Sequence, residues 1–444
     1  MAIEVFCDQV IVYSLCASIF VLPASIALLN SFAVLAVFFF FLKKINRIIA
    51  DWPVKSAHLN LLGRVYSVWK GFAPPVNFLD RPLKFLVLAV FISVVFSQYP
   101  SLSFTAFIGK FLKCVFMYFS FIESFKEEKQ IRLFLFFFFA SAFITVMSGL
   151  WQHYTGKDFL KGHIISGENF VPSGRINSTF FGANGFGVYL LPVFGLAIHL
   201  LYAAIRRHGS LVLVGVLAFF LVLLLACLCW TYSRSSWIGY LSIIFITILM
   251  DRRKALIAGA LLLVFIFIFL PSLNNVRHLY LINDNNKGVQ VKNSFLNVKS
   301  ILEQGGSGRF NFWKKAVLII RSSPIWGTGL NTYTRVLKRK IDPETWWYAH
   351  NCYLQMAAEI GIVGLACFLW MLFVLLRHGL SCCNQIKDLW TLSILQGCIS
   401  GLCGFMVQSF FDNTFFTVQL SMLMWMIFGL MVAVTRLNPM VRHE

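Results

Sequence analysis

Long apolar stretches alternate with short polar ones along most of the chain. Each apolar stretch runs for about 17–25 residues, the length with which a helix crosses the hydrocarbon core of a bilayer. Because helices satisfy their own backbone groups in lipid, the pattern predicts an all-α polytopic membrane protein with about twelve transmembrane helices. The predicted spans lie near residues 10–24, 25–42, 83–98, 104–122, 132–149, 184–204, 210–229, 236–250, 254–271, 352–376, 389–410 and 416–435. Between the first two, Pro23 leaves one long kinked helix as the alternative.

One long polar interval interrupts this pattern and divides the chain. Within it, an apolar stripe that includes Phe312, Ala316 and Ile319 predicts a short helix over 309–320, with Ser307 as its N-cap. We expect such short helices to be docked on the membrane. The predicted parts are residues 1–271 with about nine transmembrane helices, a large loop over 272–351, and residues 352–444 with about three helices and a tail.

The composition excludes a soluble protein and orients the chain. Hydrophobic residues make up 59% and charged residues only 13%, too little polar surface for a soluble domain of this size. Lys and Arg gather in alternate short loops, and the positive-inside rule places those loops and both termini in the cytoplasm. The protein is therefore predicted in a bacterial inner membrane, with the large loop in the periplasm. The basic loops are 43–83, 123–132, 206–207, 251–254 and 377–387, with the C-terminal tail.

The large loop carries more positive charge than insertion requires. It holds twelve Lys or Arg against four acidic residues, in a chain of formal net charge +20. An anionic partner on the outer face and contact with lipid head groups both explain this excess. We expect no nucleic-acid partner. The eleven Cys lie mostly within apolar spans, without the spacing of a disulfide framework or a zinc site.

Two lysines stand inside a predicted span. Lys110 and Lys113 are three residues apart and so share one helix face, at a depth of roughly 9–14 Å by helix rise. Their side chains either snorkel to the interface or have a paired or functional role. We expect them at the outer ends of the spans together with three arginines, Arg175, Arg234 and Arg309.

Three blocks around the end of the loop carry a recognisable pattern. They are an Arg-containing helix start at 307–313, a Pro-x-x-Gly-x-Gly turn at 324–329, and a His-Asn-x-Tyr-Leu-Gln-x-x-x-Glu-x-Gly-x-x-Gly helix start at 350–364. Together they resemble the signature of the O-antigen ligase and O-antigen polymerase superfamily. The resemblance is specific over about 305–365 and weaker over 172–240, where the surroundings of Arg175 match only in outline.

The resemblance implies a membrane-embedded, inverting glycosyltransferase closest to the lipid A-core:surface polymer ligase. Its donor would be a polysaccharide on undecaprenyl pyrophosphate and its acceptor a sugar hydroxyl of lipid A-core, with membrane lipids around it. By the same resemblance His350 is the general base, since an imidazole accepts protons near neutral pH. Arg175, Arg234 and Arg309 would bind the pyrophosphate, because a guanidinium makes paired bonds to phosphate and stays charged. Tyr353 and Gln355 would support His350 or contact the acceptor.

No metal or other cofactor is expected. The outer segments lack an Asp-x-Asp or a carboxylate cluster that suits magnesium or manganese. Asp342 and Glu344 form the one close acidic pair, which is typical of a solvated turn. The cations would then carry the electrostatic catalysis alone.

The roles of two acids stay open at this point. Asp412 either orients His350, holds an acceptor hydroxyl or caps the next helix. Glu359, nine positions after His350, lies near the opposite face of a straight helix and is expected to pair with an intramembrane cation. The Gly182-x-x-Gly185-x-Gly187 string is interpreted as close helix packing.

Other functions share parts of this pattern. An O-antigen polymerase or a protein O-oligosaccharyltransferase would use the same donor with another acceptor, although one large loop without an added soluble domain favours the ligase. A transporter or flippase for a lipid-linked glycan would explain Lys110, Lys113 and Glu359. Such carriers usually show internal inverted repeats, and the sequence has none that we detect.

Overall fold

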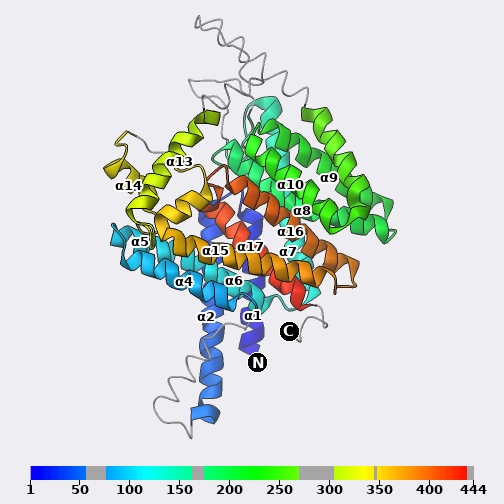
Figure 1. The fold of residues 1–444 in the computed structure, drawn as a ribbon. Coiled ribbons are helices and arrows are strands. Elements are labelled where there is room, and N and C mark those ends of the chain that lie inside the picture. The colour runs from blue at the N-terminus through cyan, green and yellow to red at the C-terminus, as the bar shows by residue number, and fades with distance from the viewer. Residues whose placement is uncertain (1, 57–76, 163–174, 270–304, 345–347, 438–444) are drawn as a thin grey trace, which may run out of the picture.

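The computed structural model describes residues 2–56, 77–162, 175–269, 305–344 and 348–437, and within them it contains helices and turns but no β-strand (Figure 1). The first helices are α1 (Ala2–Val21), α2 (Ile26–Ser56), α4 (Asp80–Val95), α5 (Pro100–Ala106), the π-helix η1 (Phe107–Leu112), α6 (Lys113–Ser124), α7 (Glu128–Thr155), α8 (Ala183–Arg206), α9 (Leu211–Trp230), α10 (Arg234–Met250) and η2 (Arg252–Lys254). A further helix covers 255–269. The last helices are α13 (Gly305–Ser322), α14 (Tyr333–Lys340), α15 (Cys352–Cys383), α16 (Leu389–Ser409), η3 (Thr414–Phe416) and α17 (Val418–Arg436).

The prediction of an all-α polytopic membrane protein is confirmed. In the described part of the chain, nine helices are long and apolar enough to cross a membrane. All twelve predicted spans fall on helices, and the three outside this count are shorter: α4, α10 and the segment 255–269. The first pair is two helices, because the chain turns at Pro23 and Ser25 N donates to Val21 O at 2.9 Å.

Two lysines predicted in the first basic loop are instead buried in the helix bundle. The helix α2 continues past the predicted end of the span at 42, so Lys43 and Lys44 remain within it. Lys43 Nζ lies 2.6 Å from Asp8 Oδ1, and Lys44 Nζ lies 2.7 Å from Glu123 Oε2. Each ammonium therefore has a carboxylate partner, which compensates the cost of its desolvation.

The described parts of the basic loops lie on one side of the helix bundle. Lys126 reaches back to Asp8 in α1 at 2.9 Å, and Arg436 in the last turn of α17 donates to Ile122 O at 3.1 Å. Arg132 stacks over the Trp390 ring 4.3 Å from its centroid. An ion pair between Arg207 and Asp388 joins two further loops. This agrees with the alternation expected from the sequence, whereas the identity of that side as the cytoplasm stays a prediction.

The centre of the bundle is formed by α8, α16 and α17, whose spans are 83%, 72% and 89% buried. A Cβ on Gly195 would lie 2.4 Å from Gly397 O, so α8 and α16 approach each other backbone to backbone. Gly187 has the same function near the start of α8, since its Cβ would meet Ser236 Oγ at 2.5 Å. The packing interpretation of the 182–187 string therefore fits Gly187, while a Cβ on Gly182 or Gly185 would meet no close neighbour.

The loop helices α13 and α14 are docked on the start of α15. Figure 1 shows both above that helix, beside α5. The predicted stripe of α13 is buried at Ala316 and Ile319, which cluster with Tyr333 and Ala358. The helix begins at Gly305, two residues before Ser307, so the predicted N-cap is wrong.

Two sequence blocks meet where α15 is broken. Gly361 has φ 73° and ψ 174°, which no helix allows, so the carbonyls before it lose their helical donors. The Pro-x-x-Gly-x-Gly turn supplies replacements, because Thr328 N donates to Ala358 O and Gly329 N to Glu359 O, both at 2.9 Å. A Cβ on Gly361 would lie 1.9 Å from Ile325 O. Glycine is therefore required both for the dihedral angles and for the close approach.

Candidate active site

The predicted arginines and the predicted base surround a single cavity. Arg175, Arg234, Arg309 and His350 come from four segments that are far apart in the sequence, and the structure brings them together. We call this the arginine cavity. Its lining residues are Arg175, Asn184, Tyr232, Ser233, Arg234, Arg309 and His350.

Arg234 occupies the cavity wall as the first residue of α10. The preceding Ser233 caps this helix, since its hydroxyl accepts from Ser236 N at 3.4 Å. The turn before it needs a left-handed residue, and Tyr232 adopts φ 48° there. The partial positive charge of a helix N-terminus thus adds to the guanidinium on this wall.

Arg175 is tethered to the same turn. Its Nε donates to Thr231 O at 2.9 Å, and its Nη2 donates to Asn184 Oδ1 at 3.1 Å. The neighbouring Ile176 is buried and donates its amide to Trp230 O at 3.1 Å. These contacts fix the guanidinium at the edge of the cavity.

Arg309 is less exposed than the other two arginines and experiences their charge. Burial lowers the pKa of its guanidinium, Asp412 raises it, and Arg234 and Arg175 lower it further. The group nevertheless stays protonated at neutral pH, as arginine does in proteins. The three cations therefore repel one another across the cavity, and a bound anion would relieve that repulsion.

His350 is held by a carboxylate and by an unusual backbone conformation. Its Nδ1 lies 3.2 Å from Asp412 Oδ1, and its carbonyl accepts from Trp313 Nε1 at 3.5 Å. The residue has φ 49°, in the left-handed region where a residue other than glycine costs about 1–3 kcal/mol. Such strain occurs at functional sites because neighbouring contacts enforce it.

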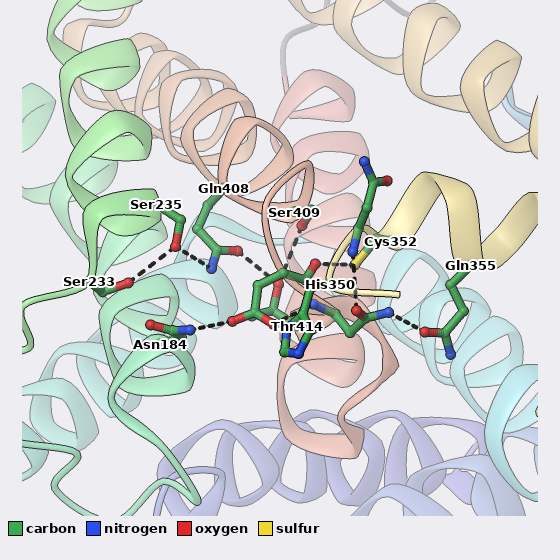
Figure 2. A network of polar contacts seen from close by, with 12 residues as sticks. Asn184, Ser233, Ser235, His350, Cys352, Gln355, Gln408, Ser409 and Thr414 are labelled. Atoms are coloured by element: carbon green, nitrogen blue, oxygen red, sulfur yellow. Dashed lines mark hydrogen bonds and ion pairs between the residues drawn. The ribbon is translucent and has the colours of Figure 1, made fainter. Parts of the chain in front are cut away.

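Asp412 connects the base to the rest of the cavity. Burial would raise its pKa, but hydrogen bonds from His350, Asn413 N and Asn184 bring the pKa below its usual range. Asn184 Nδ2 donates to Oδ2 at 2.5 Å, and Asn184 also accepts from Arg175. Of the three roles left open by the sequence, orientation of His350 is the one that this geometry supports. Figure 2 shows Asn184 and Gln355 on opposite sides of the network around His350.

Two residues predicted to support the base or contact substrate lie outside the arginine cavity. Tyr353 donates its hydroxyl to Met406 O at 2.8 Å and lines an apolar groove with Phe410. Gln355 is buried, accepts from Asn413 Nδ2 and donates to Glu359 Oε1 at 3.1 Å. The Gln355 side chain can therefore reach His350 only through other residues.

Within the described part of the chain, Glu359 does not form the ion pair expected for it. Its Oε2 accepts from Asn331 N at 2.6 Å and its Oε1 from Tyr333 N at 3.4 Å, so the carboxylate anchors the backbone after the Pro-x-x-Gly-x-Gly turn. Lys110 reaches it only indirectly, because Lys110 Nζ donates to Asn331 Oδ1 at 3.0 Å.

Lys110 and Lys113 do not join the arginines. Both line a second, mostly apolar cavity, together with Asn331 and Glu359. We call this the lysine cavity. The expectation that all the cations converge at one site is therefore corrected: the three arginines do, and the two lysines do not.

Two asparagines of the site carry no signal in the sequence. Asn184 stands in a glycine-rich helix start and Asn413 follows Asp412, and neither spacing marks a binding residue. Among the described residues, no three His, Cys, Asp or Glu side chains gather where they could hold a metal ion. Metal independence stays a prediction.

Part of the chain is similar to a known protein family. Residues 219–369 match the model of the O-antigen ligase family. The segment is therefore similar to the O-antigen ligase family. It runs from α9 into α15 and includes Arg234, Arg309 and His350, whereas Arg175 and Asp412 lie outside the match. A comparison with curated proteins finds no match for the chain.

Proposed function

We propose that the protein transfers a polysaccharide from undecaprenyl pyrophosphate to a sugar hydroxyl of lipid A-core, on the periplasmic face of the inner membrane. The observation that carries this proposal is the grouping of three guanidiniums around an imidazole that is hydrogen-bonded to a carboxylate. The O-antigen ligase match over 219–369 supports the same class of reaction.

The three guanidiniums suit the leaving group. A pyrophosphate gains negative charge as the glycosidic bond breaks, and fixed cations stabilise that charge more in the transition state than in the ground state. Arg175 and Arg234 lie at exposed positions of the cavity, and Arg309 is partly buried. We assign all three to the pyrophosphate, with no metal ion required.

His350 suits the role of general base. Because Asp412 accepts from Nδ1, the proton of the neutral imidazole resides there, and Nε2 keeps its lone pair. In the proposed step the acceptor hydroxyl oxygen bonds to the anomeric carbon while the bond from that carbon to the pyrophosphate oxygen breaks. The hydroxyl proton moves to Nε2, and the electron pair of the broken bond stays on the pyrophosphate. A single displacement of this kind inverts the anomeric configuration.

The proposal is tested with the purified full chain, a lipid-linked donor and a lipid A-core acceptor in the presence of a chelator. We expect transfer without added metal and a product of inverted configuration. Activity that is lost in chelator and restored by a divalent cation would remove the metal-independent mechanism.

A deletion strain separates this function from its rivals. Loss of core-attached chains with long lipid-linked chains accumulating indicates the ligase. Single repeat units on the core indicate a polymerase, and donor trapped on the cytoplasmic side indicates a flippase.

A further inference from the structure

The lysine cavity is a separate apolar space between helices. Its helical walls come from α4, η1, α6, α15 and α17, and most of its lining is aliphatic or aromatic. These helices belong to predicted membrane spans, so the surroundings are hydrocarbon. Representative lining residues are Leu86, Phe111, Met356, Phe368, Phe415 and Trp425.

Such a space fits a hydrocarbon chain better than water. The apolar part of this cavity offers a water molecule none of the two to four polar partners that it needs. A lipid chain that enters from the bilayer gains packing contacts but little hydrophobic free energy, since it leaves an equally apolar medium. Selectivity must therefore come from polar groups at the cavity.

The polar groups of the lysine cavity leave a positive charge uncompensated. Lys110 and Lys113 donate to the amide oxygens of Asn331 and Asn30, which are neutral. Among the described residues, no carboxylate lies within ion-pair distance of either ammonium. An ammonium within a membrane segment is costly unless it finds a counter-charge.

The nearby carboxylate does not supply that counter-charge directly. Glu359 also lines the cavity, but its two oxygens accept from the backbone amides of Asn331 and Tyr333 and from Gln355. These donors surround and stabilise the carboxylate on the loop side. An anion could thus contact the lysines while the protein holds the acid in place.

The helix that carries the lysines is locally distorted. Lys110 belongs to the π-helix η1, and Lys113 follows it directly. Segments of π-helix are rare and are frequently found at functional sites. The helix is fixed above this segment, where Ser103 Oγ donates to Leu330 O at 3.0 Å. A Cβ on Gly109 would meet nothing within 4 Å, so the distorted segment borders open space.

We propose that the lysine cavity binds a phosphorylated membrane lipid, with its phosphate on Lys110 and Lys113 and one chain in the apolar space. This site is distinct from the arginine cavity and does not depend on the transfer reaction. The occupant is a lipid and not free phosphate, because most of the side chains that line the cavity are apolar.

The test uses the full chain in phosphatidylcholine nanodiscs that contain a small fraction of phosphatidylglycerol with a photoreactive acyl chain. We expect cross-links at cavity residues such as Phe415 and Trp425. Lys110→Gln/Lys113→Gln should reduce cross-linking at least five-fold, whereas the control Lys157→Gln/Lys314→Gln, which removes two exposed lysines, should leave it within two-fold.

Several outcomes would overturn the proposal. Equal cross-linking of a photoreactive phosphatidylcholine would mean a groove without charge selectivity. Displacement of the probe by millimolar inorganic phosphate would mean a free-phosphate site. Unchanged cross-linking in the double lysine variant would remove the lysines from recognition. If that variant is unstable, Ser421→Phe, which fills the cavity from α17, must reduce cross-linking instead. Because no glycosyl transfer is measured, failure here would leave the proposed function standing.

Discussion

The arginine cavity and the lysine cavity differ in almost every respect. The first is polar, is built from loop segments and helix ends, and holds its cations around an imidazole. The second is apolar, is built from helix walls, and holds its cations near a buried acid. The contrast fits the two proposals, in which loop segments position the reacting groups and the membrane helices bind a lipid.

A chain of hydrogen bonds joins the two cavities. It runs from Lys110 to Asn331, Glu359, Gln355, Asn413, Asp412 and His350. Gln355 is the midpoint, since its amide bonds to both Glu359 and Asn413. The comparison therefore predicts some substitutions that affect one cavity and one that affects both.

The largest effect should come from His350→Asn. Asparagine tolerates the left-handed backbone but cannot serve as the base, so transfer should fall by about 10²–10⁴-fold. The measurement is the initial rate with purified enzyme, donor and acceptor. His208→Asn is a matched control, because His208 is exposed and has φ 48° against 49° at His350. Lipid cross-linking in the lysine cavity should not change. Transfer at the normal rate would exclude His350 as the base.

Arg309→Gln should come next, with a loss of about 10²-fold in kcat/KM, the usual cost of removing one preorganised donor. Arg309→Lys should recover only part of the lost activity, because an ammonium lacks the paired N–H donors of a guanidinium. Arg321→Gln, at an exposed position on the same helix, is the control. If Arg309→Gln weakened lipid binding in the lysine cavity instead, the separation of the two sites would fail.

Gln355→Met should affect both cavities moderately. The change leaves Asn413 Nδ2 without its acceptor and removes one donor from Glu359, which lowers the free energy of unfolding by about 1–3 kcal/mol. Transfer should fall about ten-fold as Asp412 and His350 lose their support, a change of about 1.4 kcal/mol. Gln419→Met is the control, since that buried glutamine donates to Leu22 O and takes no part in this chain of hydrogen bonds. Normal transfer in Gln355→Met would mean that the cavities are independent.

The smallest effect concerns acid stability. The pKa of Asp412 is below its usual range, so its stabilising contribution is present above the ordinary Asp pKa of about 4 and is lost as the pH falls through the lower folded-state pKa. Asp412→Asn should therefore be less stable than the native chain at pH 7, with a difference that narrows below about pH 4. Thermal midpoints from pH 7 to pH 3 measure this. A constant difference would show that the carboxylate charge is not the cause.

The apolar pattern predicts the helices well because membrane helices are selected by length and hydropathy alone. It misses what is decided by tertiary partners. The sequence predicts Lys43 and Lys44 in a loop, but their ion pairs with Asp8 and Glu123 allow α2 to bury them. No local feature of the sequence predicts those partners.

For the site too, part could be predicted from the sequence and part depends on tertiary contacts. The motif blocks point to Arg309 and His350, and the structure brings Arg175 and Arg234 to the same cavity. Helical periodicity correctly pairs Lys110 with Lys113 but says nothing about which cavity that face lines. The contacts of Glu359 were unpredictable because they depend on a helix break at Gly361 and on a turn about thirty residues earlier, at Gly327–Asn331.

The junction between that turn and the broken helix limits how the protein can move. Withdrawing the turn would strip the carbonyls of Ala358 and Glu359 of their donors, at about 1–3 kcal/mol for each buried group. The turn is therefore a rigid element and not a movable gate. Substrates that enter and leave would therefore use another wall of the bundle.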